Sequence, residues 1–184
     1  MAGRLLLAGG EGRDRDALAE TLAEMGWTVE PCDPELALPE GNDALVVIAG
    51  PGGDVARLEA DVTQPVALLR RFVAAGSGSR SVALLVIIGP AHGEGIAEPG
   101  LLESAVPGLA RAAAPRARVN AVRIVSYRTS TFPVALSEAL TLLLGNHAMT
   151  GQTIRLDGHS ASGDTFCGGE RGTFTGPARH EDDI

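Results

Sequence analysis

Asp61, His92, Glu94 and Glu103 are the residues of this chain best suited to acid–base chemistry. A histidine titrates near neutral pH, and carboxylates beside it can move a proton on a bound substrate. If Asp61, His92 and Glu103 met in one pocket, they would suit a cyclase, dehydratase or isomerase that works without a nucleotide. The plainer interpretation, which we favour, makes residues 92–95 a polar turn and Glu103 a solvated helix residue.

Metal binding and nucleophilic catalysis find no support in the spacing of their usual residues. The other histidines and the two cysteines stand far apart: His147, His159, His180, Cys32 and Cys167. They lack the spacing of metal ligands, and we expect two reduced thiols rather than a disulfide. The serines Ser104, Ser160 and Ser162 lack the context of a nucleophile elbow, so hydrolase chemistry is not predicted.

Composition and charge exclude further classes. The net charge is −8 and all 15 basic residues are arginine, which argues against a nucleic-acid partner, because phosphate binding needs a basic face. The longest apolar runs fall well short of the roughly 18 residues that span a membrane. The first residues do not resemble a signal peptide, so we expect a cytoplasmic protein with no membrane partner.

Strands and helices that could position these residues alternate along the chain. Short apolar runs predict strands at residues 4–8, 27–30, 44–49, 82–88, 119–125 and 153–156. Helical spacing predicts helices at residues 16–25, 55–75, 101–114 and 133–144, the third disturbed by Pro107 and Gly108. Residues 31–42, with three prolines, are expected to form a loop. Alternation of this kind predicts an α/β fold, a doubly wound parallel sheet with helices on both faces.

The chain is expected to hold one domain, residues 1–158, followed by a tail, residues 159–184. The tail is rich in Gly, Ser, Thr and charged residues, and Phe166, Phe174 and Ile184 are its only large apolar residues. Such a composition cannot bury a core of its own. We expect the tail to dock on a neighbouring subunit near the mouth of that subunit's active site, or else to be disordered.

Two C-terminal segments resemble a known family. Residues 118–122, Arg-Val-Asn-Ala-Val, and residues 150–158, Thr-Gly-Gln-Thr-Ile-Arg-Leu-Asp-Gly, are similar to the last two core strands of short-chain dehydrogenases/reductases. Residues 42–50 are similar to the family's "D-x-L-V-N-N-A-G" strand and turn. The resemblance implies a Rossmann-like sheet of about six strands. It also implies truncation, because residues 31–41 are too few for the family's third strand and adenine-contacting loop.

The family's cofactor positions are altered. Gly9 matches the first glycine of the "T-G-x-x-x-G-x-G" turn, but Arg13 and Arg15 fall on the second and third. Those glycines let a dinucleotide pyrophosphate lie against bare backbone. Arg123-Ile124 replaces the "P-G" pair that contacts nicotinamide. We therefore expect no cofactor in this chain.

The family's catalytic positions are altered as well. Active members use a Tyr-x-x-x-Lys pair, whose lysine holds the nicotinamide ribose and lowers the tyrosine pKa, and this chain contains no lysine. The resemblance places the former catalytic positions, Asn, Ser, Tyr and Lys, at Asp61, Pro90, Pro99 and Glu103. The single tyrosine, Tyr127, lies beyond the following strand. The expected catalytic set is therefore none.

What persists is the set of segments by which the family assembles. The helices that contain Asp61 and Gly108 resemble those of its four-helix interface, and residues 152–156 resemble its other two-fold contact. This implies a non-catalytic subunit of a heterotetramer, whose active short-chain dehydrogenase partner binds NADP or NAD and acts as a ketoreductase or dehydrogenase, in polyketide or other secondary-metabolite biosynthesis. The alternatives are the nucleotide-independent enzyme and a homodimer that is structural or binds a small molecule.

Overall fold

The computed structural model describes residues 3–10, 12–35, 37–39, 41–49, 58–75, 81–88, 98–125 and 132–156. At residues 58–61, 98, 99, 132 and 133 the description covers the helical backbone and not the side chains. The tail after residue 158, Pro90, His92, Glu94 and Tyr127 lie outside the described residues.

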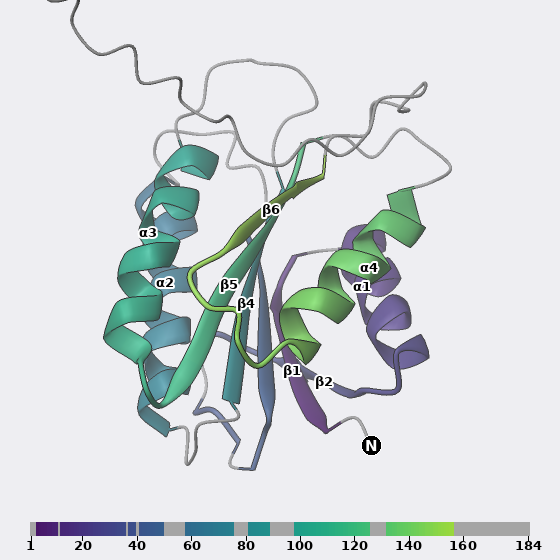
Figure 1. The fold of residues 1–184 in the computed structure, drawn as a ribbon, viewed down its shortest axis with the longest axis horizontal. Coiled ribbons are helices and arrows are strands. Elements are labelled where there is room, and N and C mark those ends of the chain that lie inside the picture. Colours follow the sequence, from purple (N-terminus) through teal and green to yellow (C-terminus); the bar gives the residue numbers. More distant parts are fainter. Residues whose placement is uncertain are drawn as a thin grey trace, which may run out of the picture.

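The described residues form a six-stranded parallel sheet in the order β2-β1-β3-β4-β5-β6 (Figure 1). The strands are β1 (Arg4–Gly9), β2 (Thr28–Cys32), β3 (Ala44–Ala49), β4 (Ser81–Ile88), β5 (Ala117–Ile124) and β6 (Thr153–Leu156). The helices are α1 (Gly12–Glu24), α2 (Leu58–Ala75), α3 (Glu98–Ala113) and α4 (Phe132–Gly145). Helices α2 and α3 cover one face and α1 and α4 the other, so the predicted α/β, doubly wound fold is confirmed.

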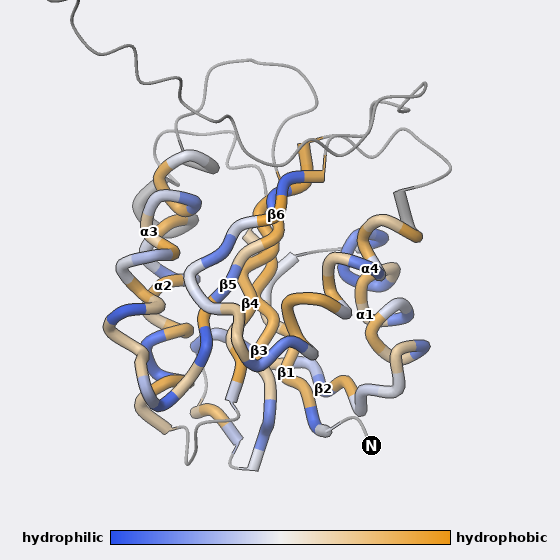
Figure 2. Tube along the Cα trace, viewed as in Figure 1, coloured by the Kyte–Doolittle hydropathy of each residue, from blue (hydrophilic) through white to orange (hydrophobic). Residues whose placement is uncertain are grey.

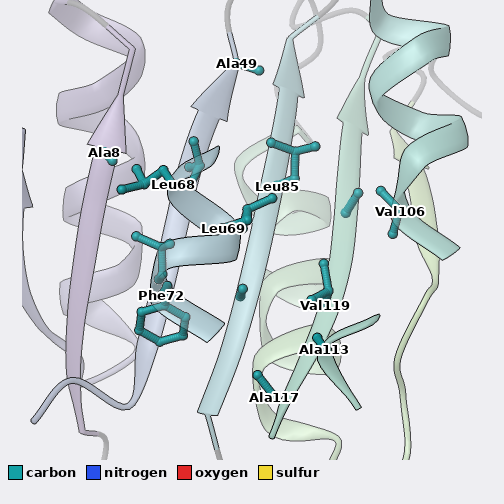
Figure 3. Packing of buried hydrophobic residues seen from close by; sticks show 14 of the residues in the cluster. Ala8, Ala49, Leu68, Leu69, Phe72, Leu85, Val106, Ala113, Ala117 and Val119 are labelled. Carbon is teal, nitrogen blue, oxygen red and sulfur yellow. The ribbon is translucent and has the colours of Figure 1, made fainter. Parts of the chain in front are cut away.

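The core is aliphatic and has two halves, one on each face of the sheet. Along β3, Leu45 and Val47 face α2 and α3, whereas Val46 and Ile48 face α1 and α4. The apolar strands β3 and β4 are buried along their whole length, as expected of a parallel sheet covered on both faces (Figure 2). Among the buried residues that the structure describes, Phe72 of α2 is the one aromatic side chain (Figure 3).

Strand β5 is fixed to its surroundings by two buried polar side chains. The Arg118 guanidinium donates hydrogen bonds to the carbonyls of Leu143, Leu144 and Asn146 at the C-terminal end of α4. These carbonyls lie at the end of the helix and accept no hydrogen bond from within it. A cation at this end also interacts favourably with the negative pole of the helix dipole. The Asn120 amide donates to the Met149 carbonyl at 3.0 Å and accepts from the Gln152 N–H at 3.1 Å.

Three predicted features differ from the structure. Strand β2 continues through Pro31 and Cys32, which were expected to begin a loop. Pro31 is tolerated because β2 is an edge strand, bonded to β1 on one side only. Helix α1 begins at Gly12, four residues before the expected start at residue 16, because its charged first turn carries no apolar pattern.

Helix α3 is continuous through Pro107 and Gly108, which were expected to disturb it. A proline costs the bond to the carbonyl four residues earlier, that of Glu103. On either side, Val106 and Ala110 are buried against the sheet, and this packing holds the helix across the missing bond.

Candidate functional site

The carboxyl ends of the strands form the edge at which open α/β sheets bind ligands. They lie at the top of Figure 1, where α1 and α3 begin. In the turn from β1 to α1, Gly9 and Gly10 have φ of 73° and 64°, a conformation that favours glycine. A Cβ on Gly9 would lie 2.3 Å from the Ile48 carbonyl oxygen, so the turn passes directly against β3.

Arginines occupy the first turn of α1, where the family resemblance expects glycines. Arg13 is exposed and Arg15 is half-buried. Gly12 begins the helix with φ of 58°, and a Cβ there would meet nothing within 4 Å. The turn thus has a conformation typical of glycine, but two long side chains follow where a pyrophosphate would need bare backbone.

Between α1 and α4, the carboxyl edge is packed with aliphatic side chains. A recess of about 30 Å³ remains there, lined by Asp14, Leu18, Ile48, Val86, Ile88, Ile124 and Leu136. Ile48 is 3% exposed and stands at one of the two Asn positions of the "D-x-L-V-N-N-A-G" pattern. A recess of this size holds about two waters, whereas small-molecule sites are typically 300–1,000 Å³. This recess is too small for a dinucleotide.

On the other side of the sheet, Glu103 and Arg123 form an ion pair. The Nη1 of Arg123, near the end of β5, donates to Oε2 of Glu103 on α3 at 2.7 Å. The two side chains are 22% and 26% exposed, so the pair is largely shielded from water. It joins the position expected to hold the family's lysine to a position expected to contact nicotinamide.

The surroundings of Arg123 explain why it takes a carboxylate partner. In the β5–β6 register Arg123 lies beside Arg155, and side chains in register on adjacent parallel strands share a face. Glu103 brings a negative charge to a strand pair that carries two arginines in register. The Nε of Arg123 is buried and has no hydrogen-bond partner among the described residues.

The structure describes the expected site residues unevenly. Glu103 lies on α3, with its carboxylate bound by Arg123 as above. The backbone of Asp61 is in the first half of α2, and that of Pro99 is in the first turn of α3. Pro90 and His92 lie outside the described residues. Convergence of Asp61, His92 and Glu103, the alternative that the sequence left open, is therefore not tested by the described residues.

Cys32, at the carboxyl end of β2, is a free and buried thiol. Burial raises the pKa of the Cys32 thiol above its ordinary value of 9.0, and the Arg71 guanidinium partly opposes that rise. Its Sγ lies 3.6 Å from the Asp33 carbonyl oxygen. Because the thiolate is the nucleophile, this cysteine is poorly suited to catalysis.

Two other site types are not found in the described part of the chain. It contains no group of three or more His, Cys, Asp or Glu side chains placed to hold a metal ion. None of its helices is both long enough and apolar enough to cross a membrane.

Sequence reasoning missed the Glu103–Arg123 ion pair. It singled out both residues separately, Glu103 at the lysine position and Arg123 in place of the "P-G" pair. The available indication was their opposite charge at two positions that the family places around one cofactor. Their contact depends on how α3 packs on β5, which single-residue comparison does not supply.

Comparisons with known proteins identify the fold. A scan against protein-family models gives no match, and neither does a search of curated proteins. Among solved structures, the chain is similar to a small-chain dehydrogenase, with 17% identity and a TM-score of 0.61 over 87% of this chain and 98% of the other. A 3-alpha-hydroxysteroid dehydrogenase from Pseudomonas sp. B-0831, solved with NADH, has 21% identity and a TM-score of 0.58 over 84% and 95%.

The reductase LugOII, which carries out keto-reduction in lugdunomycin biosynthesis, has 16% identity and a TM-score of 0.57 over 83% of this chain and 94% of its own. At such identities the likeness shows the fold alone. The described residues have the Rossmann-like fold of the short-chain dehydrogenases/reductases.

Proposed function

We propose that this protein is a non-catalytic subunit of a heteromeric short-chain dehydrogenase or ketoreductase. The observation that carries the proposal is the Glu103–Arg123 ion pair, 2.7 Å long and about three-quarters shielded from water. It brings an acidic residue and its own counter-ion to the position where the resemblance expects a lysine.

The chemistry of the family explains why this exchange matters. A lysine there stabilises the tyrosinate through its positive charge and donates hydrogen bonds to ribose hydroxyls. A carboxylate can only accept hydrogen bonds when ionised, and Arg123 already binds that of Glu103. The tyrosine position itself is Pro99, which carries no acidic proton.

The cofactor position gives independent support. An aliphatic recess of about 30 Å³ and the arginines at positions 13 and 15 do not suit a dinucleotide. We therefore assign NADP or NAD to the active partner, and no step of the reaction to this chain. We extend the proposal to secondary-metabolite biosynthesis, in which LugOII, a protein of similar fold, acts.

The surface formed by α4 and β6 is suited to hold that partner. Of the three large hydrophobic side chains exposed among the described residues, two lie on α4: Val134 at 61% and Leu142 at 45%. Beside α4, β6 is an edge strand with one side of its backbone unpaired in the sheet. Proteins usually cover such an edge, and exposed apolar side chains beside it are typical of an assembly surface.

Co-expression with an intact short-chain dehydrogenase from a neighbouring gene of the same genome tests the proposal. We expect the two chains to co-purify as a heterotetramer with ketoreductase or dehydrogenase activity. Val134→Glu/Leu142→Glu should release the partner, whereas Ala17→Glu on the exposed side of α1 should not. If the chains never co-purify and the partner is fully active alone, the proposal fails.

A further inference from the structure

An open groove of about 170 Å³ lies between the C-terminal halves of α2 and α3. Its buried and half-buried lining is apolar and includes Leu69, Val73, Leu109 and Val119. Figure 3 shows Leu69 and Val119 on this face of the sheet.

The exposed lining of the groove is basic. Arg70 and Arg116 both lie at its surface, and none of its lining residues is acidic. The ion pairs of the described residues, Arg4–Glu30 and Arg123–Glu103, involve neither of them. Two guanidinium groups thus flank an apolar surface on a chain whose net charge is −8. This arrangement suits a segment in which an aliphatic side chain adjoins carboxylates.

We propose that the groove binds residues 181–184 of this chain, Glu-Asp-Asp-Ile. They contain the only three consecutive acidic residues in the sequence, followed directly by Ile184. The carboxylates would pair with Arg70 and Arg116, and Ile184 would cover the apolar lining. The proposal concerns these four residues, whereas the neighbour contact expected from the sequence rests on Phe166 and Phe174.

The connecting chain is long enough for this contact. Residues 157–180 separate β6 from the acidic segment, 180 − 156 = 24 residues. Fully extended, they span about 80 Å. A domain of this size has a radius of gyration of about 15 Å, and hence a diameter of roughly 40 Å. The segment can therefore reach the groove of its own copy.

Because the contact is small, the fraction of molecules that form it depends on the chain that joins residues 181–184 to the domain. Exposed ion pairs contribute little, and a single aliphatic side chain adds a modest amount, so a free peptide would bind weakly. A flexible tether gives an effective concentration in the millimolar range, which makes a weak contact common within one molecule. Because surface ion pairs are screened, the contact should weaken with salt.

Photo-crosslinking on the full-length chain tests the proposal. p-Benzoylphenylalanine replaces Ala112, an exposed groove residue, and in a matched control replaces Thr141 on the exposed side of α4. Trypsin cleaves after Arg179, so the captured segment is identified as the peptide 180–184. We expect that crosslink at single-chain mass from position 112 and not from position 141.

The crosslink should fall at least fivefold in Arg70→Glu/Arg116→Glu, in Glu181→Gln/Asp182→Asn/Asp183→Asn, and in the unmutated sequence at 0.5 M NaCl. The measurement at 0.5 M NaCl needs no substitution in the groove. Crosslinks from position 112 to α2 or α3 of a second copy, to another part of the tail, or to no peptide would overturn the proposal. The chain is tested without a partner, so this result is separate from that of the proposed function.

Discussion

At the scale of single residues, Glu103 and Arg123 form a largely shielded ion pair. Their opposite charges join α3 to β5. A pair that is about a quarter exposed is worth less than the Coulomb energy of a fully buried one, because water and its own desolvation offset the attraction. Breaking it leaves Arg123 largely buried without its partner.

A double-mutant cycle measures the ion pair. We expect Glu103→Gln and Arg123→Gln each to lower the free energy of unfolding by about 1–3 kcal/mol, with a coupling energy of about 1 kcal/mol. Urea denaturation gives these values, and Glu138→Gln on the exposed side of α4 is the matched control. Strictly additive effects would mean that the pair does not form in solution.

Cys32 predicts a pH dependence at alkaline pH. Because burial raises its pKa in the folded state above the ordinary 9.0, the folded chain retains a proton that the unfolded chain releases. The contribution of Cys32 to stability is therefore complete below pH 9 and is lost as pH rises through the folded-state pKa. Thermal unfolding between pH 7 and 10 should show a steeper decline than in Cys32→Ala. Equal slopes in the two proteins would contradict the assignment.

At the scale of elements, the apolar patterns predicted some strands with the correct bounds and misplaced the ends of other elements. Residues 44–49 and 153–156 were predicted with the bounds that β3 and β6 have. The start of α1 was missed because its first turn is charged, and the end of β2 because proline suggests a loop. In both places the bounds of the element depend on the sheet. Pro31 is accommodated because β2 pairs with a strand on one side only, and the turn at Gly9 and Gly10 fixes where α1 begins.

The candidate site was predictable only in part. Comparison with the family's motifs identified Arg13, Arg15, Glu103 and Arg123 as departures. It did not show that Ile48 and its neighbours leave a recess of only about 30 Å³, because that volume depends on how α1 and α4 pack over the strand ends. Side-chain contacts between elements distant in sequence are set by tertiary packing.

Arg118 ties α4 to the sheet, and its removal should be costly. Arg118→Leu leaves the carbonyls of Leu143, Leu144 and Asn146 without these donors in a buried setting. We expect a loss of about 2–4 kcal/mol in the free energy of unfolding. Arg155→Leu, at an exposed position of β6, should change it by less than about 0.5 kcal/mol. Similar losses in both variants would refute a specific role in capping α4.

At the scale of the whole molecule, the described residues keep the parallel sheet and leave a small recess between α1 and α4. The order β2-β1-β3-β4-β5-β6 and a TM-score of 0.61 to a small-chain dehydrogenase give the chain the family's fold. Among the described residues, aliphatic side chains pack between α1 and α4, and an ion pair joins α3 to β5. A protein of this kind would act through the surfaces it presents, among them α4 and β6.

The isolated chain should not bind a nicotinamide cofactor. Calorimetric titration with NADPH or NADH should show no saturable heat up to about 1 mM, because the recess lacks the volume of a ligand site. Gly9→Ala at the turn cannot serve as a control, since a Cβ there would collide with the Ile48 carbonyl. An active short-chain dehydrogenase measured in parallel supplies the reference.

The most direct test of the central claim is the number of cofactors bound by the purified complex of this chain with its dehydrogenase partner. If this chain is the non-catalytic subunit, titration with NADPH or NADH gives one cofactor for each pair of chains, and turnover survives Glu103→Gln in this chain. One cofactor for each chain, or loss of turnover in Glu103→Gln with the complex intact, would contradict the account.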